Sequence, residues 1–74
     1  MEVLLFGLIA EKAGASKIQL EATTVDALRR SLAEQIPDFG NLSYAIAVDR
    51  RIVTGDRSLT GKEQVAVLPP FAGG

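Results

Sequence analysis

The apolar residues of this chain fall into short runs that have two different periods. Val3–Phe6 is apolar at every position and stops at Gly7, which makes it too short for a helix. Such a run is typical of a strand covered on both faces, next to a parallel neighbour. Gln64–Leu68, near the other end of the chain, has a similar composition. We therefore expect these two runs to pair in the middle of one sheet.

Three other segments have the features of shorter strands. Lys17–Glu21 alternates between polar and apolar residues, which predicts a half-exposed strand. Ala45–Val48 is a further apolar run, and the residues Asp49–Arg51 turn it towards the short pair Ile52–Val53. The pattern therefore predicts one sheet built from short strands.

One amphipathic helix is predicted from a stripe of apolar residues spaced three or four apart: Val25, Leu28, Leu32 and Ile36. Thr23–Asp26 supplies capping residues before the stripe, and Pro37 prevents the helix from continuing. A shorter helix of barely two turns is expected over Leu8–Ala13, closed by Gly14. We interpret Phe39–Tyr44 as a connecting loop.

The predicted order is strand, strand, helix, strand, short strands, strand. This order describes an α+β fold of the β-grasp (ubiquitin-like) type, a mixed sheet with one main helix packed across it. We expect a β-grasp domain over residues 1–68 and a flexible, projecting C-terminal tail over residues 69–74.

The composition narrows the classes of function. The 74 residues include no cysteine and no histidine, and 8 Lys and Arg against 9 Asp and Glu give a net charge of −1. Cysteine and histidine are the commonest nucleophile, general base and zinc ligands, so we expect neither a self-contained hydrolase nor a metal site. A net charge near zero argues against a nucleic-acid partner.

The N-terminal apolar run has the wrong flanks for a targeting signal. Glu2 precedes Val3–Ala10 and Glu11–Lys12 follow it, whereas a signal peptide begins with basic residues. The run is also too short to span a bilayer. We therefore expect a cytoplasmic protein that does not associate with a membrane.

The C-terminal residues carry the most specific pattern. Pro69 and Pro70 cannot donate to a strand ladder, so they end the last strand and stiffen the chain beyond it. Fully extended, the six residues from 69 to 74 would reach about 20 Å. Phe71 is an apolar residue that we expect to contact a partner groove rather than the core. Ala72 separates it from the final pair of glycines.

Gly73 and Gly74 lack Cβ atoms, so they can enter a channel too narrow for other residues. The α-carboxylate of Gly74 is inert until its oxygen is made a leaving group, for example by adenylation. We therefore expect Gly74 to be the reactive residue and residues 69 to 73 to be the tail and partner-binding residues.

These features resemble the small subunit of molybdopterin synthase, a family of ubiquitin-like sulfur carriers. The resemblance runs from Val3–Phe6 through the helix at Val25–Leu28 to the ending Val65–Gly74, and Pro-Pro-x-x-Gly-Gly is its most discriminating part. Sulfur carriers of the thiamine pathway share the fold and the terminal glycines but usually lack the paired prolines. Two departures are Lys62 in a turn where the family often has Asp, and Asp49 where it often has Asn.

The resemblance implies a two-stage cycle that depends on partner proteins. An E1-like adenylyltransferase would use ATP to adenylate Gly74, and sulfur would then replace the adenylate to leave a thiocarboxylate. In the large synthase subunit the sulfur would pass to cyclic pyranopterin monophosphate, within a heterotetramer. The chain would be a sulfur-donating cosubstrate with no catalytic side chains of its own and no permanently bound cofactor.

Two other classes of function share these features. A ubiquitin-like modifier would be joined through Gly74 to a lysine of a target protein, and a plain interaction domain would have an incidental tail. The sequence leaves the role of Arg50, Arg51 and Arg57 open between a basic patch and solvated turns.

Overall fold

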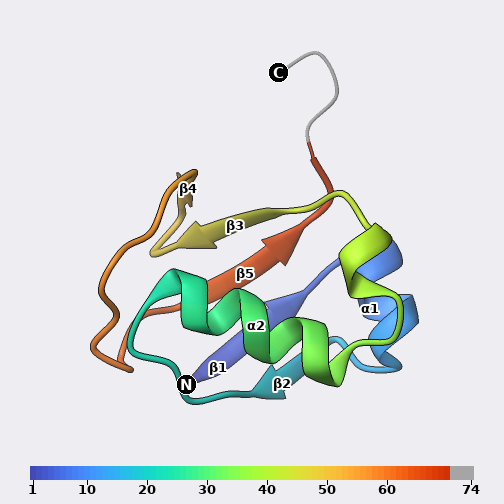
Figure 1. The fold of residues 1–74 in the computed structure, drawn as a ribbon, viewed down its shortest axis with the longest axis horizontal. Helices are drawn as coiled ribbons and strands as arrows, with labels where there is room; N and C mark the ends of the chain where they lie inside the picture. The colour runs from blue at the N-terminus through green and yellow to red at the C-terminus, as the bar shows by residue number, and fades with distance from the viewer. Residues whose placement is uncertain (71–74) are drawn as a thin grey trace.

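The computed structural model describes residues 1–70. Its elements are β1 (Glu2–Leu5), α1 (Gly7–Ala13), β2 (Lys17–Gln19), α2 (Val25–Gln35), the 3₁₀ helix η1 (Phe39–Asn41), β3 (Ala45–Val48), β4 (Arg51–Val53) and β5 (Val65–Leu68). The five strands form one mixed sheet in the order β2-β1-β5-β3-β4, and α2 lies across one face of it (Figure 1). This is the predicted β-grasp fold, and the fold class is confirmed.

The two most apolar strands lie side by side in the sheet, as the sequence predicts. β5 is the central strand, parallel to β1 and antiparallel to β3. Val67 is opposite Leu5 on one side and opposite Ile46 on the other. Pairing on both edges satisfies the backbone of β5, which is the middle strand of the five.

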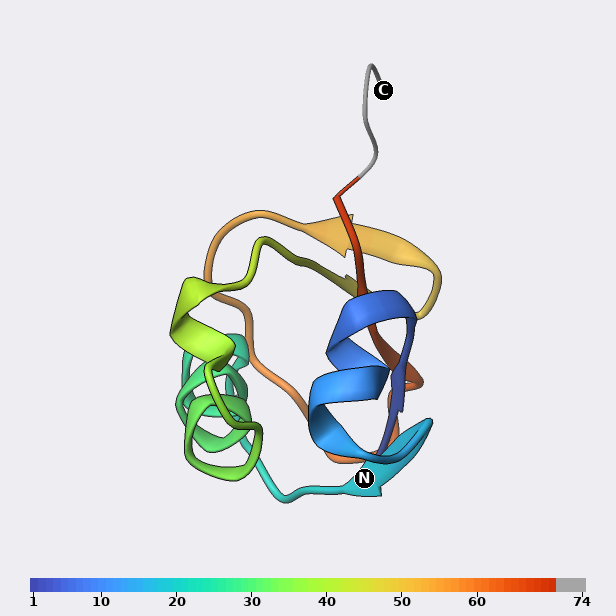
Figure 2. The same ribbon diagram turned by 90° about the vertical axis from the view of Figure 1, so that its right-hand side faces the viewer.

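The core lies between the sheet and both α-helices, and the sheet curves around the core (Figure 2). Ile9 of α1 and Leu28 and Leu32 of α2 belong to the same buried cluster as Val3 and Val65 of the sheet. Both helices therefore pack against one face of the sheet. The predicted apolar stripe of the main helix does point into the core, with Leu28 and Leu32 fully buried.

The expectation that the first apolar run is covered on both faces is wrong. Val3 and Leu5 are buried, but Leu4 between them is only half-buried, because within residues 1–70 both α-helices lie on the other side of the sheet. Phe6 lies just beyond the end of β1. It is the N-cap residue of α1 and its side chain is 44% exposed.

The start of α2 is fixed by segments from elsewhere in the chain. The amide groups of Val25–Ala27 would otherwise lack partners at this helix end. They donate to the Arg57 carbonyl (2.8 Å), to Oδ1 of Asp56 (2.9 Å) and to Oγ1 of Thr24 (3.1 Å). The predicted capping role of Thr24 is confirmed, and Asp56 is a second cap that local sequence spacing could not reveal.

The segment predicted as a connecting loop contains part of the core. Phe39 begins η1 and is 2% exposed, and its ring centroid lies 4.4 Å from that of Tyr44. The apolar residues of this short segment, Phe39, Leu42 and Tyr44, follow no sustained helix or strand period, so the sequence pattern did not predict the burial of Phe39.

The structure explains both departures from the family pattern. Asp49 has a φ of 49°, a left-handed conformation that Asp and Asn both tolerate. Its carboxylate accepts the amide of Gln64 at 3.0 Å. In the turn before β5, the Glu63 carboxylate accepts the amides of Thr60 (2.8 Å) and Gly61 (3.0 Å), whereas Lys62 is exposed. The turn therefore depends on Gly61 and Glu63 rather than on Lys62.

Truncating either of the fully buried leucines Leu28 and Leu32 to alanine should cost about 2–5 kcal/mol of the free energy of unfolding, as for other large-to-small core changes. Urea denaturation of each variant measures this, with Glu34→Ala on the exposed side of α2 as the control. If either leucine variant is as stable as the control, the helix does not pack as described.

Asp56 should make stability depend on pH. Amide donation from Asp26 and Arg57 lowers the pKa of the Asp56 carboxyl below its ordinary value of 3.8. The folded state binds this proton less readily than the unfolded chain, so the stabilisation is present above about pH 4 and is lost as the pH falls through the lowered pKa.

Urea denaturation from neutral pH down to pH 3 or below measures this loss, where about pH 3 lies under the carboxyl's ordinary range. Asp56→Asn keeps an acceptor oxygen but cannot titrate, so this variant should lose less stability on acidification than the unmodified chain. Glu34→Gln on the exposed side of α2 should follow the unmodified chain. Equal acid sensitivity in all three proteins would contradict the assignment of Asp56.

Candidate functional site

The structure describes two of the six residues that the sequence predicts to act. Pro69 and Pro70 follow β5 directly, and both are exposed. Residues 71–74 (Phe71, Ala72, Gly73 and Gly74) lie outside the described residues. Their roles, and the tail as a segment separate from residues 1–68, stay predictions.

The base of the predicted tail is anchored in the centre of the sheet. β3 pairs with β5 along its whole length, so that Ala45 is opposite Leu68, the last residue of the strand. Val65 and Val67 are completely buried. The residues after Leu68 therefore continue from a strand that is paired on both edges and buried on its inner side.

A small apolar hollow adjoins the two prolines. It has a volume of about 220 Å³ and is lined by Leu8, Ile9, Leu42, Ser43, Pro69 and Pro70. Leu8 is 52% exposed, although it is a large apolar side chain. The sequence pattern did not single out Leu8. This residue lies in the predicted short helix, but the pattern did not assign that helix a buried face and an exposed face.

The face of the sheet opposite the helices is apolar across most of its width, and all of its apolar residues except Ala47 are half-buried or exposed. At the β2 edge the register places polar residues on this face: Glu2, Lys17 and Gln19. Residues paired across neighbouring strands share a face. The register therefore places one set of side chains here, which we call the apolar sheet face: Leu4, Ala45, Ala47, Ile52, Ala66 and Leu68. Half of the set is alanine, so a partner could approach this surface closely. Leu68 makes the face continuous with the base of the tail.

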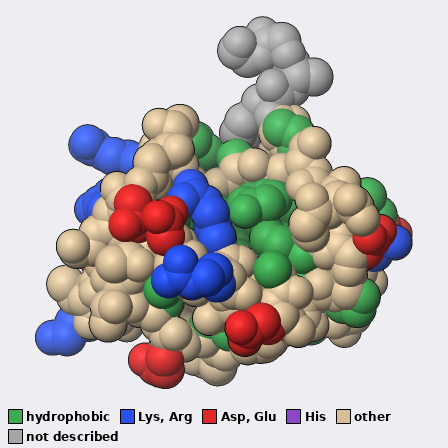
Figure 3. Space-filling view, in the orientation of Figure 1, with side chains coloured by type: hydrophobic (Ala, Val, Ile, Leu, Met, Phe, Trp, Pro, Cys, Tyr) green, Lys and Arg blue, Asp and Glu red, His purple; other side chains and the backbone are tan. Residues whose placement is uncertain are grey.

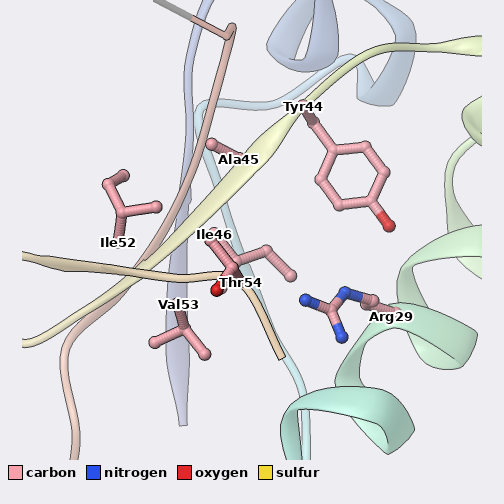
Figure 4. Close-up of a pocket in the computed structure, with 7 residues that line it drawn as sticks. All are labelled: Arg29, Tyr44, Ala45, Ile46, Ile52, Val53 and Thr54. Carbon is pink, nitrogen blue, oxygen red and sulfur yellow. The ribbon is translucent and has the colours of Figure 1, made fainter. Parts of the chain in front are cut away.

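A second, larger hollow lies between α2 and the ends of β3 and β4 (Figure 3). Its volume is about 440 Å³, and Figure 4 shows Arg29 and Tyr44 on one side of it and Val53 on the other. Arg29 donates to the Asp26 carboxylate at 2.8 Å. The cation of this hollow is therefore already paired with an acid.

The arginines Arg50, Arg51 and Arg57 are exposed, as expected for solvated turns. Arg50 has a left-handed φ of 70° in the β3–β4 turn, and the Arg57 carbonyl caps α2. The backbone of Arg50 and Arg57 thus has a structural role.

The described residues offer surfaces for binding but no assembled set of reactive side chains. Among residues 1–70 there is no group of three or more carboxylate, histidine or cysteine side chains that could hold a metal ion. No helix in this part of the chain is long and apolar enough to cross a membrane. What the arrangement presents is an anchored strand end with apolar surfaces on two sides of it.

A family model described as the ThiS family matches residues 3–74. No match was found among curated proteins. The fold is similar to that of solved structures, each of which the chain covers almost completely.

One of these structures is the small archaeal modifier protein 1 of H. volcanii, with a TM-score of 0.81 and 17% identity over 95% of each chain. Another is the putative molybdopterin converting factor subunit 1 of Pyrococcus furiosus, with a TM-score of 0.80 and 24% identity over 95% of each chain. A complex of subunits 1 and 2 of the molybdopterin-converting factor of Helicobacter pylori contains a chain with a TM-score of 0.71 and 22% identity, over 99% of this chain and 96% of that one. At these identities the likeness establishes the fold.

Proposed function

The chain belongs to the ThiS family, and from this premise we propose that it is the sulfur-carrying small subunit of a molybdopterin synthase. The resemblance to ubiquitin-like sulfur carriers that the sequence suggested agrees with this family and with the fold. The activity rests on Gly74, whose carboxylate is loaded with sulfur by one partner and unloaded by another.

One observation carries the proposal: the family match includes the whole folded domain together with the ending that follows β5. A carrier needs a stable domain for recognition and an end that reaches into a partner's active site. β5 supplies the connection between them, because its pairing with β1 and β3 continues up to the prolines. Catalytic side chains are not required of such a chain.

The loading chemistry is a substitution at the Gly74 carbonyl in two steps. A carboxylate oxygen attacks the α-phosphorus of ATP on an E1-like adenylyltransferase, which forms the acyl-adenylate and releases pyrophosphate. A hydrosulfide ion, or a donor that delivers sulfur at the same oxidation level, then attacks the Gly74 carbonyl carbon. The bond from that carbon to the AMP oxygen breaks, AMP leaves and a thiocarboxylate remains. ATP is consumed by the partner and is not a bound cofactor of this chain.

The unloading step takes place in the large synthase subunit, where the thiocarboxylate sulfur is transferred to cyclic pyranopterin monophosphate. The H. pylori complex of subunits 1 and 2 supports a partner of this kind. We assign the apolar sheet face to this contact, because most of its side chains are half-buried or exposed and it runs into the base of the tail at Leu68. Two such pairs would form the heterotetramer.

A second candidate function is protein modification through an isopeptide bond from Gly74 to a lysine. It is favoured by the likeness to the small archaeal modifier protein of H. volcanii. Both functions begin with the same adenylate, so they differ only in the final acceptor. Higher-mass conjugates of the chain in cell extracts would support modification, and a product containing the chain's sulfur but not the chain would support sulfur transfer.

Adenylation should depend on the identity of the last residue. With the E1-like enzyme and labelled pyrophosphate, the unmodified chain should support ATP–pyrophosphate exchange. Deletion of Gly74, or extension of the chain by one alanine, should abolish the exchange. In the first case the terminal carboxylate stops short of the α-phosphorus, and in the second case it lies beyond it. The thermal midpoints of all three proteins should agree closely, since terminal residues contribute little to the core.

The Leu28→Ala variant is the matched control, because it weakens the fold without touching the tail. At a temperature where this variant remains folded, it should still support exchange. Exchange by the chain lacking Gly74 would show that another residue is activated and would remove the basis of the proposal.

Ile52→Asp should weaken binding to the large subunit by more than about 1 kcal/mol, the lower limit for an energetically important interface residue. Ile52 is 48% exposed on the apolar sheet face, so a carboxylate there harms the contact more than the fold. Calorimetric titration of the two subunits measures the affinity.

Ala33→Glu is the control for Ile52→Asp. It also places a carboxylate at an exposed apolar residue, but on α2 at the opposite side of the sheet. This control should leave the affinity unchanged. Equal affinities of the two variants would mean that the large subunit binds elsewhere.

A further inference from the structure

Pro69 lies against Gly7 at a distance that only glycine permits. A Cβ atom built on Gly7 would lie 2.7 Å from Cγ of Pro69 and 3.6 Å from its Cδ. Carbon atoms that are not bonded prefer separations of about 3.5–4.0 Å. Any side chain at position 7 would therefore push the proline ring away from its present place.

The backbone holds these two residues in register. Position 7 connects β1 to α1 with a φ of +61°, a left-handed conformation. Just before it, the amide of Phe6 donates to the Val67 carbonyl at 3.2 Å, which extends the parallel pairing of β1 and β5 by one bond. Gly7 comes one residue after the donor, Phe6, and Pro69 comes two residues after the acceptor, Val67. Neither can shift far without breaking it.

The contact concerns the direction of the chain more than its stability. Pro69 is exposed, so covering it with Gly7 buries little apolar surface. Pro69 also helps to line the small hollow with Leu8 and Leu42. The residue thus contacts the β1–α1 connection and adjoins this hollow, at the first position after β5.

We propose that Gly7 is a positioning residue for the C-terminal tail. Because it lacks a Cβ atom, it admits the Pro69 ring against the start of α1, and this contact sets the direction in which residues after Pro69 leave the domain. The geometric part stands on the contact itself. Its consequence for adenylation rests on the proposed function.

The chain offers a matched control for Gly7→Ala. Gly14 also has a left-handed conformation, with a φ of +72°, and it lies at the other end of α1. A Cβ atom there would meet nothing within 4 Å. Gly7→Ala and Gly14→Ala therefore carry similar backbone strain and should lower the thermal midpoint by similar amounts, but only Gly7→Ala displaces Pro69.

A spin label can report the direction of the tail without any partner. The chain has no cysteine, so Ala72→Cys gives one site for a nitroxide, whose broadening of amide signals maps the surface that it visits. The parent and the Gly14→Ala variant should show the same broadened amides, and the Gly7→Ala variant a different set. Pro69→Ala, which removes the ring itself, should also change the set and covers the case in which Gly7→Ala does not fold.

If Gly7→Ala or, where that variant does not fold, Pro69→Ala leaves the broadened amides as in the parent, the proposal is wrong. In the exchange assay, kcat/KM should fall by about tenfold or more for Gly7→Ala, since a misplacement of the reacting carboxylate by roughly 1 Å is enough for such losses. The kcat/KM of Gly14→Ala should equal that of the parent. In a Pro69→Ala background, Gly7→Ala should have no further effect. A chain that is never adenylated would contradict the proposed function, whereas the label experiment would still decide the role of Gly7.

Discussion

The structure depends above all on the pairing of β5 with both of its neighbours. This strand is parallel to β1 and antiparallel to β3, and its inward side chains Val65 and Val67 are completely buried. The same strand leads into Pro69 and the residues of the proposed reaction. A chain of 74 residues has a narrow margin of stability. One strand, β5, both lies at the centre of the core and leads into the proposed tail, so no separate element is needed to anchor the tail.

The elements with strong periodicity could be predicted from the sequence. The stripe of α2, its cap at Thr24 and the pairing of the two apolar runs follow from local patterns and are confirmed. Contacts between distant segments could not be predicted in this way. Asp56 caps a helix 30 residues earlier in the chain, and no spacing rule connects the two.

The candidate site divides in the same manner. That Gly74 is its reactive end is a prediction from the Pro-Pro-x-x-Gly-Gly ending, which is a pattern of neighbouring residues. The apolar sheet face and the contact of Gly7 with Pro69 required the strand register and the backbone geometry. The expectation that Val3–Phe6 is covered on both faces was wrong, because an apolar run has the same sequence pattern whether or not a helix of the same domain covers its outer face.

The central claim is that Gly74 carries sulfur. The most direct test is the intact mass of the chain after incubation with the E1-like enzyme, ATP and a sulfur donor. A thiocarboxylate makes the chain heavier by the difference between one sulfur and one oxygen atom, and fragmentation should place that difference at Gly74. An unchanged mass with an active enzyme and donor, or an added sulfur at any other residue, would contradict the account.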